Sequence, residues 1–315
     1  MQAQVKENIY KIETFDDIVK LCKSKDVGED IESLKQIKRH IYKLDRLVGM
    51  KSLKEQLTYQ ILYYVQGFEG DDMLHTALMG PPGVGKTTVA KVLADIYKSL
   101  GFLSKGKLIV ATREDLVGQY LGETALKTRS LLEFAKGSVL FIDEAYSLGN
   151  TCNADSYTKE CVDTLVAFLS ENTKDFVCII AGYEKELKQY FFDSNPGLDR
   201  RFPWKYSLEP YKPSELSTIF VNNVKGKWKL QKPKELAKKV ESLIIQHKDL
   251  FCNSGGDILA LVSACKMAHS KRVFGLEKNT KMLLTEADIV KGLNVYIKNK
   301  NTKDDNFTRV AHMYL

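Results

Sequence analysis

The chain has 315 residues, of which 44% are hydrophobic and 28% are charged, and its formal net charge is +7. This composition is ordinary for a folded protein of one or two domains, and it excludes a chain that is disordered throughout. The sequence has no apolar run long enough to cross a membrane and no apolar secretory segment at its start, so we expect a soluble intracellular protein, in the cytoplasm, without a membrane partner. A charge of +7 does not by itself indicate nucleic-acid binding.

In chain order, residues 1–43 form a leader whose apolar residues recur at helical spacing, and we expect two short helices there. Residues 44–70 are typical of a turn followed by a long amphipathic helix. Short apolar strands and helices then alternate, which predicts an α/β domain over residues 44–208 with a parallel sheet covered on both faces. The expected strands are 76–79, 107–111, 138–142 and 176–181, and the expected helices are 86–100, 124–136 and 156–171.

Four of the seven prolines, at 196, 203, 210 and 213, fall in one short stretch, where we place a domain boundary. Beyond it we expect no further strands. The remaining pattern predicts a small helical lid domain over residues 209–298, followed by a flexible polar tail, 299–315. The expected lid helices are 213–224, 233–248, 256–274 and 285–298.

The connection between the first strand and its helix is the segment Gly80-Pro81-Pro82-Gly83-Val84-Gly85-Lys86-Thr87, which fits the phosphate-loop pattern G-x-x-x-x-G-K-[ST]. Glycines let such a loop wrap around phosphates and present backbone N–H donors at the start of a helix. We predict that Lys86 reaches the β- and γ-phosphates of ATP and that the Thr87 hydroxyl binds Mg²⁺, with Thr88 next in the binding segment. A glycine-rich turn that matches by chance is disfavoured by the strand before it and the helix after it.

A second segment, Val139-Leu140-Phe141-Ile142-Asp143-Glu144, is typical of a buried strand that ends in two carboxylates. We predict that Asp143 supports the metal and that Glu144 orients the attacking water. Alone, the acidic pair would be interpreted as the surface cap of a strand, but the phosphate loop upstream favours ATP hydrolysis. The five histidines are scattered, so Mg²⁺ carried by the nucleotide is the metal that the sequence implies.

These segments resemble the AAA+ ATPases, and within them the CbxX/CfxQ group, which includes the red-type Rubisco activase and the stage V sporulation protein K. The likeness covers about 44–298, and it implies a P-loop AAA+ nucleotide domain with a helical lid. It also implies a homo-oligomeric ring, usually a hexamer, with ATP between subunits. Its further marks are Leu47-Val48-Gly49-Met50, Ala145-Tyr146-Ser147-Leu148, Ala181-Gly182-Tyr183, Asn195-Pro196-Gly197-Leu198 and Leu284-Thr285-Glu286-Ala287-Asp288.

The resemblance assigns two more roles. Arg201 matches the arginine finger that reaches the γ-phosphate in the neighbouring subunit, and Arg200 is a second candidate. Tyr120, Leu121 and Gly122 resemble the pore loop with which AAA+ remodelers grip a polypeptide. The alternative interpretation of that segment is a loop with one half-exposed tyrosine.

The chain also departs from the family pattern. Gly256 stands where the lid helix usually carries the sensor 2 arginine, so that residue is absent or is replaced by Lys266 or Arg272. At sensor 1, Tyr183 is the one polar candidate after the fourth strand.

The leading hypothesis is an ATP-hydrolysing ring that remodels or threads a protein client, in the manner of a chaperone. One alternative is a nucleic-acid motor or loader, supported by the lysines around Trp228, although a solvated lysine-rich turn explains them more simply. Another is a scaffold that assembles on ATP and hydrolyses it poorly, which the missing sensor 2 arginine would permit.

Overall fold

The computed structural model describes residues 10–313, apart from residues 69, 71, 121, 150–155, 227 and 278–280. It divides into two compact units. The sheet unit comprises Met1–Gly80 and Lys86–Leu208, and the helical unit comprises Pro81–Gly85 and Glu209–Leu315.

The sheet unit is built on five parallel strands in the order β2-β3-β4-β1-β5. The strands β1, β3 and β4 are buried along their whole length, which explains why the sequence shows them as unbroken apolar runs. The first four strands lie within one residue of their predicted bounds, so the predicted α/β fold with a parallel sheet is confirmed. The strands are β1 Thr76–Met79, β2 Leu108–Ala111, β3 Val139–Ile142, β4 Val177–Gly182 and β5 Trp204–Ser207.

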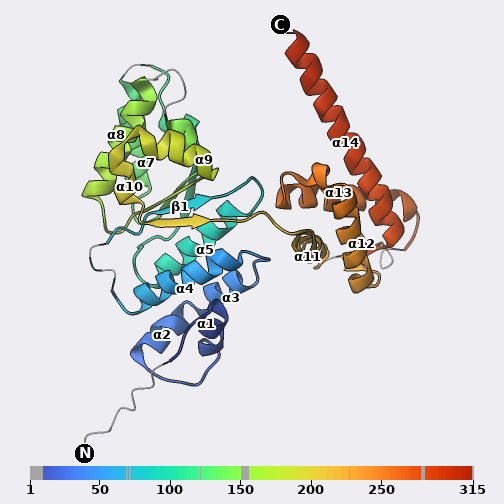
Figure 1. Ribbon diagram of the computed structural model, residues 1–315, viewed down its shortest axis with the longest axis horizontal. Coiled ribbons are helices and arrows are strands. Elements are labelled where there is room, and N and C mark those ends of the chain that lie inside the picture. The colour runs from blue at the N-terminus through green and yellow to red at the C-terminus, as the bar shows by residue number, and fades with distance from the viewer. Residues whose placement is uncertain are drawn as a thin grey trace, which may run out of the picture. The chain divides into compact units, whose positions relative to one another are not determined.

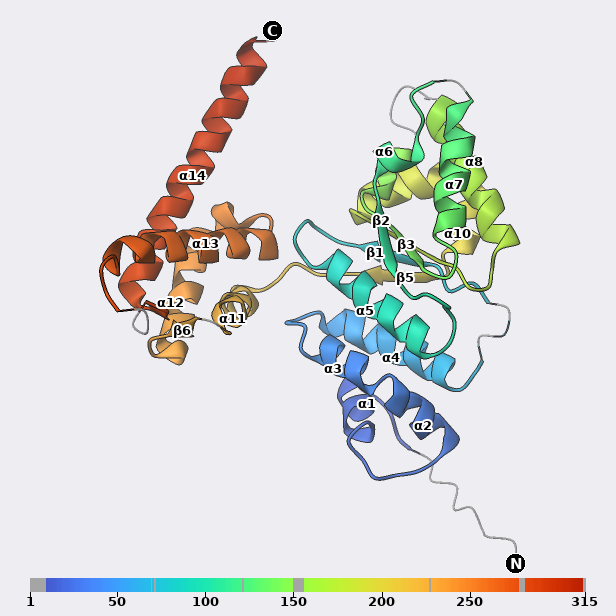
Figure 2. The same cartoon turned by 180° about the vertical axis from the view of Figure 1, so that it is seen from behind.

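Helices cover both faces of this sheet (Figure 1). The helices α4 (Lys51–Val65) and α5 (Lys86–Ser99) lie on one face, and α7 (Glu123–Phe134) and α8 (Ser156–Glu171) lie on the other, as the reverse view confirms (Figure 2). On the second face, Phe168 of α8 belongs to a buried cluster that also contains strand residues such as Ile180. The remaining segments are α6 Arg113–Leu116, the 3-10 turns Ala145–Leu148 and Phe192–Ser194, α9 Glu184–Glu186, a π-helical turn Leu187–Phe191 and α10 Pro196–Arg201.

The strand β5 was not predicted, because it lies inside the proline-rich stretch interpreted as a domain boundary. It pairs with β1 at the edge of the sheet, with Thr76 opposite Trp204. An edge strand is buried on fewer sides, and only Tyr206 among its four residues is buried, so β5 lacks the apolar run that marks a central strand.

The leader contains three helices rather than the predicted two: α1 (Phe15–Leu21), α2 (Glu29–Gln36) and α3 (Lys38–Asp45). Ile37 separates the last two, because its φ of −93° and ψ of 3° end α2 and begin α3. Ile18, Ile37 and other apolar residues of the leader are fully buried, and α1 and α3 contact α4 and α5. The leader is therefore part of the sheet unit.

The helical unit corrects two expectations. Strands do occur after the proline-rich stretch: β6 (Lys229–Leu230) and β7 (Leu283–Leu284) form a short parallel pair. The segment predicted to be a flexible tail is helical up to Met313, because the chain contains no glycine or proline after Gly292 that would end the helix. The helices are α11 Pro213–Val224, α12 Pro233–Gln246, α13 Gly255–Arg272 and α14 Glu286–Met313, with a 3-10 turn at Lys248–Phe251.

Within the described part of the chain, no helix combines the length and the apolar character that a membrane span requires.

Candidate nucleotide site

The phosphate loop begins where β1 ends, at the carboxyl edge of the sheet. The Gly80 N–H donates to the carbonyl oxygen of Gly182 at 3.0 Å, which fixes the start of the loop to the end of β4. A side chain at Gly80 would place its Cβ 2.6 Å from the carbonyl oxygen of Leu208, so only glycine fits there. Gly85 precedes α5 with a φ of 95°, a conformation that other residues rarely adopt. These backbone demands account for the glycine spacing of the motif.

Lys86, the first residue of α5, lies at the centre of the site. Its ammonium donates to the carbonyl oxygen of Gly80 at 2.8 Å and lies 5.7 Å from the centre of the Tyr183 ring. Partial burial lowers the pKa of Lys86, and the nearby charges of Asp143 and Glu144 oppose this shift. The structure thus brings Lys86 within electrostatic reach of both predicted carboxylates. Thr87 and Thr88 follow in the first turn of α5 with exposed side chains.

Asp143 and Glu144 follow directly after β3, whose four residues are all buried. The Glu144 N–H donates to Oδ1 of Asp143 at 3.0 Å, so the first carboxylate is held by the backbone of the second residue. Glu144 is exposed and has a left-handed backbone, with φ 50° and ψ 42°. A non-glycine residue in this region carries strain of about 1 to 3 kcal/mol, and such strain concentrates at functional sites. The geometry directs Glu144 away from the sheet and towards solvent.

Two tyrosines complete the carboxyl edge around these carboxylates. The centres of the Tyr146 and Tyr183 rings lie 5.8 Å apart. Tyr146 also lies close to the backbone of Gly182, because a Cβ added at that glycine would be 2.8 Å from the Tyr146 ring. Burial, followed by the charge of Glu144, raises the pKa of Tyr146 to about 12, so it stays a neutral donor near that carboxylate. The sequence reasoning gave Tyr146 no role. The sequence did contain one signal for this position, because Tyr146 follows Glu144 by only two residues.

Arg201 lies at the end of α10. Its Nε donates to the hydroxyl of Ser170 on α8 at 2.9 Å, and its Nη1 donates to the carbonyl oxygen of Gly197 at 2.7 Å. These contacts direct the guanidinium towards α8 and its own helix, so the structure does not bring it together with Lys86 in one chain. The neighbouring Arg200 is exposed. The assignment of Arg201 to a neighbouring subunit stays a prediction.

Tyr120 lies in the connection between α6 and α7, and its side chain is 70% exposed. The base of this connection is anchored, because the Gly118 N–H donates to the hydroxyl of Thr124 at 3.0 Å and Glu123 accepts from the Tyr120 N–H at 3.3 Å. Gly122 has a φ of 84° before α7. Leu121, the middle residue of the predicted pore loop, lies outside the described residues. The tyrosine is thus more exposed than the alternative interpretation of a half-exposed loop residue assumed.

In the helical unit, the two residues considered as sensor 2 substitutes make internal contacts. Arg272 donates to both carboxylate oxygens of Asp288, at 2.9 and 2.8 Å. The Lys266 ammonium lies 5.5 Å from the centre of the Trp228 ring. Trp228 in turn packs edge-on against His269, at 5.2 Å between ring centres. The tryptophan at the centre of the lysine-rich segment therefore contributes to the packing of this unit.

Comparisons with known proteins show the family and the fold of this chain. Residues 76–192 match the model of the ATPase family associated with various cellular activities. A putative CfxQ-like protein of Acanthamoeba polyphaga mimivirus is 36% identical over 88% of this chain and 69% of its own length. The chloroplastic ribulose bisphosphate carboxylase/oxygenase activase of Cyanidioschyzon merolae is 36% identical over 70% of this chain and 71% of its own. The crystal structure of the FIGL-1 AAA domain in complex with ADP aligns with 89% of this chain and with 90% of its own chain, with a TM-score of 0.59. The sequence identity is 17%, so this likeness shows a shared fold.

Proposed function

This chain belongs to the CbxX/CfxQ group of the AAA ATPases, and on that premise we propose that it hydrolyses ATP and uses the reaction to remodel or thread a protein client. The observation that carries the proposal is the arrangement at the carboxyl edge of the sheet. There, the Lys86 ammonium contacts the Gly80 carbonyl oxygen and lies within electrostatic reach of Glu144, whose backbone is strained, at the end of buried strands.

The phosphate loop and Lys86 would bind the β- and γ-phosphates, because backbone N–H groups at the start of α5 and one ammonium offset their charge. Binding would exchange the contact between Lys86 and the Gly80 carbonyl for contacts with phosphate oxygens. The hydroxyl of Thr87 and the carboxylate of Asp143 are hard oxygen donors that fit Mg²⁺, which would offset charge on the transferring phosphoryl group. Glu144, exposed and free of the sheet, would accept a proton from the attacking water.

Charge that spreads over the γ-phosphoryl group needs a further directed cation, and a guanidinium supplies two donors. Arg201 would serve this role in the neighbouring subunit of a ring, which we propose to be a hexamer. In the isolated chain its donors contact Ser170 and Gly197, so the finger is held in a defined orientation on α10.

Tyr120 would contact the client. An exposed aromatic side chain grips a polypeptide of any sequence through contact area, and Gly122 gives its loop the freedom to move. The Cyanidioschyzon merolae relative is named as an activase of ribulose bisphosphate carboxylase/oxygenase, whereas the client proposed for this chain is any loosely folded polypeptide segment. The edge-on packing of the half-buried Trp228 against His269 favours a polypeptide client over a nucleic acid.

The proposal is tested by the rate of ATP hydrolysis with an unfolded polypeptide, with single-stranded DNA and with neither. We expect stimulation by the polypeptide alone. Tyr120→Ala should keep the basal rate and lose the stimulation. Tyr59→Ala is the matched control, because Tyr59 is a tyrosine on α4 with 72% exposure, close to that of Tyr120. Stimulation by DNA would contradict the proposed client class, and an equal response of the two variants to polypeptide would contradict the proposed role of Tyr120.

A further inference from the structure

The middle of the phosphate loop, Pro81–Gly85, belongs to the helical unit rather than to the sheet unit. Two successive carbonyl groups of this segment accept hydrogen bonds from other parts of the helical unit. The Gly255 N–H, at the start of α13, donates to the Gly83 carbonyl oxygen at 3.1 Å. The Tyr211 hydroxyl donates to the Val84 carbonyl oxygen at 2.9 Å. The backbone of the loop is therefore held by residues that lie far from it in the sequence.

These two contacts set the direction of two backbone N–H groups. A trans peptide unit is planar, so its C=O and N–H bonds point in opposite directions. Because the Gly83 carbonyl points towards Gly255, the N–H of Val84 points away from α13. Because the Val84 carbonyl points towards Tyr211, the N–H of Gly85 points away from the Tyr211 hydroxyl. The backbone N–H groups of such a loop are the donors that a bound phosphate requires.

The contact between the loop and α13 leaves no room for a side chain. A Cβ at Gly83 would lie 1.9 Å from the carbonyl oxygen of Asn253, and a Cβ at Gly255 would lie 2.7 Å from the carbonyl oxygen of Gly83. The added atom at Gly255 would also lie 3.9 Å from the Tyr211 ring. The loop, the start of α13 and this tyrosine therefore pack closely, and a methyl group at Gly255 would have to displace the loop.

Tyr211 is suited to hold a carbonyl group beside a phosphate site. It lies in the connection between β5 and α11, where Pro210 and Pro213 restrict the backbone on both sides. Its half-buried ring packs against the apolar core of the helical unit. Burial, followed by the charge of Glu215, raises the pKa of Tyr211 to about 12, so the hydroxyl keeps the proton that it donates. A neutral donor also adds no negative charge that would repel a phosphate.

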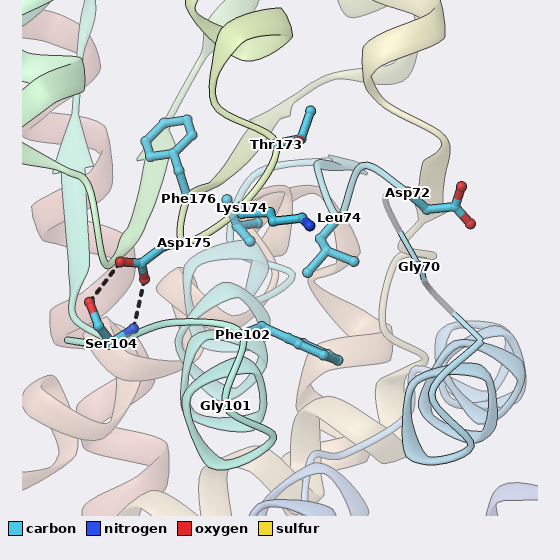
Figure 3. Close-up of a pocket in the computed structure, with 11 residues that line it drawn as sticks. Gly70, Asp72, Leu74, Gly101, Phe102, Ser104, Thr173, Lys174, Asp175 and Phe176 are labelled. Atoms are coloured by element: carbon cyan, nitrogen blue, oxygen red, sulfur yellow. Dashed lines mark hydrogen bonds between the residues drawn. The ribbon is translucent and has the colours of Figure 1, made fainter.

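The opposite edge of the sheet shows a similar hydrogen bond without a phosphate loop. There, the connections before β2 and β4 are joined, because the Asp175 carboxylate accepts from the Ser104 N–H at 2.7 Å and from the Ser104 hydroxyl at 2.9 Å (Figure 3). Loss of the Ser104 hydroxyl would thus remove one hydrogen bond between connections at the other ends of the strands. This residue provides a matched control for Tyr211.

We propose that Tyr211 is a positioning residue for nucleotide binding, because its hydroxyl and the Gly255 N–H together orient the phosphate loop. In the loop held in this way, the N–H groups of Val84 and Gly85 face the phosphates of the bound nucleotide. The inference rests on the proposed ATP site, and it adds to that site a residue outside the phosphate-loop motif. Loss of the hydroxyl removes one neutral hydrogen bond, so we expect nucleotide affinity to fall about three- to tenfold.

The test measures the affinity of the full chain for two ligands: methylanthraniloyl-ADP with Mg²⁺, followed by its fluorescence, and pyrophosphate, which competes with it. Pyrophosphate has no nucleoside, so it reports on the phosphate-binding donors alone. Tyr211→Phe keeps the ring and its packing and removes the hydroxyl. It should weaken both ligands by the same factor, about three- to tenfold, whereas Ser104→Ala should leave both within twofold.

Gly255→Ala is a second variant, because its methyl group must displace the Gly83 carbonyl oxygen although the Tyr211 hydroxyl is still present. Both ligands should bind at least threefold more weakly to it. Unchanged affinity for both ligands in either variant, or a loss in Tyr211→Phe that is confined to the ADP analogue, would overturn the inference and leave the proposed function intact. A wild-type chain that binds neither ligand would overturn the proposed function as well.

Discussion

Glu144 of the sheet unit and Asp288 of the helical unit are both carboxylates at the start of a helical segment, yet their surroundings are opposite. Glu144 is exposed on a strained left-handed backbone, next to Lys86 at the carboxyl edge of the sheet. Asp288 is 0% exposed and accepts from Arg272, from the Thr285 hydroxyl at 2.9 Å and from the Thr285 N–H at 2.9 Å. We propose that the first acid takes part in the reaction, whereas the second is paired with Arg272 and holds α13 to α14.

The two units also differ in charge. Residues 1–208 contain 28 basic and 29 acidic residues, a net charge of −1, whereas residues 209–315 contain 19 basic and 11 acidic residues, a net charge of +8. The positive net charge of the whole chain, +7, therefore comes from the helical unit. Within that unit, Lys266 and Arg272 contact Trp228 and Asp288, so part of the positive charge serves internal packing. A residue's type thus decides its role only together with the contacts around it.

Among the substitutions that test these differences between the units, we expect the largest effect on ATP hydrolysis from a change at Arg201 of the sheet unit. Arg201→Ala should keep ATP binding and lower the steady-state ATPase rate about 10³-fold, because loss of a finger removes stabilisation of the transition state. The matched change is Arg200→Ala, at the exposed neighbouring arginine, which should have little effect. Circular dichroism would show that loss of the contacts to Ser170 has not unfolded α10.

Mixed rings show whether this arginine acts between subunits. Lys86→Ala and Arg201→Ala chains should each be inactive, but a mixed ring contains interfaces with an intact Lys86 site beside an intact Arg201. Partial activity should therefore return on mixing. If co-assembly is demonstrated and activity stays absent, the shared site is wrong.

Asp288→Asn tests the structural role of the buried carboxylate in the helical unit. Asp288 is buried whereas the Arg272 side chain is 37% exposed, so the variant weakens charge-assisted hydrogen bonds to a partly solvated guanidinium, and the free energy of unfolding should fall by about 2 to 3 kcal/mol. Glu286→Gln is the control, because Glu286 is exposed and its contact with Lys239 at 3.2 Å is a surface ion pair worth at most about 1 kcal/mol. Urea unfolding would measure the free energy of unfolding of both variants. Equal stability of the two variants would show that Asp288 is not structural.

The smallest expected effect is a pH dependence from His75 in the core of the sheet unit. Burial, helped by the charge of Arg201, lowers the pKa of His75 to about 3, and its Nδ1 accepts from the Cys178 N–H at 3.1 Å, which requires the neutral ring. The unfolded chain, with a histidine pKa near 6.5, binds more protons below that pH. The stability from the neutral ring is therefore complete above about pH 6.5 and is lost as the pH falls towards 3.

Denaturation at pH 7 and pH 5 should show a fall of about 2 kcal/mol in the stability of the sheet unit from this group. His75→Asn keeps an acceptor for the Cys178 N–H and removes the titration, so its curve should be flatter between these pH values. If the free energy of unfolding depends on pH equally in the wild type and in His75→Asn, then His75 is not the group responsible for this pH dependence.

The sequence predicted the parts of the fold that rest on burial and on backbone conformation. The strands β1 and β3 are apolar because both faces are covered, and Gly80 and Gly85 are glycines because the loop backbone requires them. Edge strand β5 was missed because its one buried residue gives no pattern. Contacts that bring distant segments together, such as Tyr146 with Tyr183 or Phe102 with Tyr64, have no local signal in the sequence.

The central claim is that Glu144 activates water at a site that Lys86 and the phosphate loop form, and one sample can test it. ATP bound to the chain and phosphate released from it would be measured together for wild type and Glu144→Gln. The amide keeps the shape of the side chain and loses the base, so we predict unchanged ATP binding with hydrolysis slower by about 10² to 10⁴. Hydrolysis by Glu144→Gln at the wild-type rate, with ATP bound normally, would contradict the account.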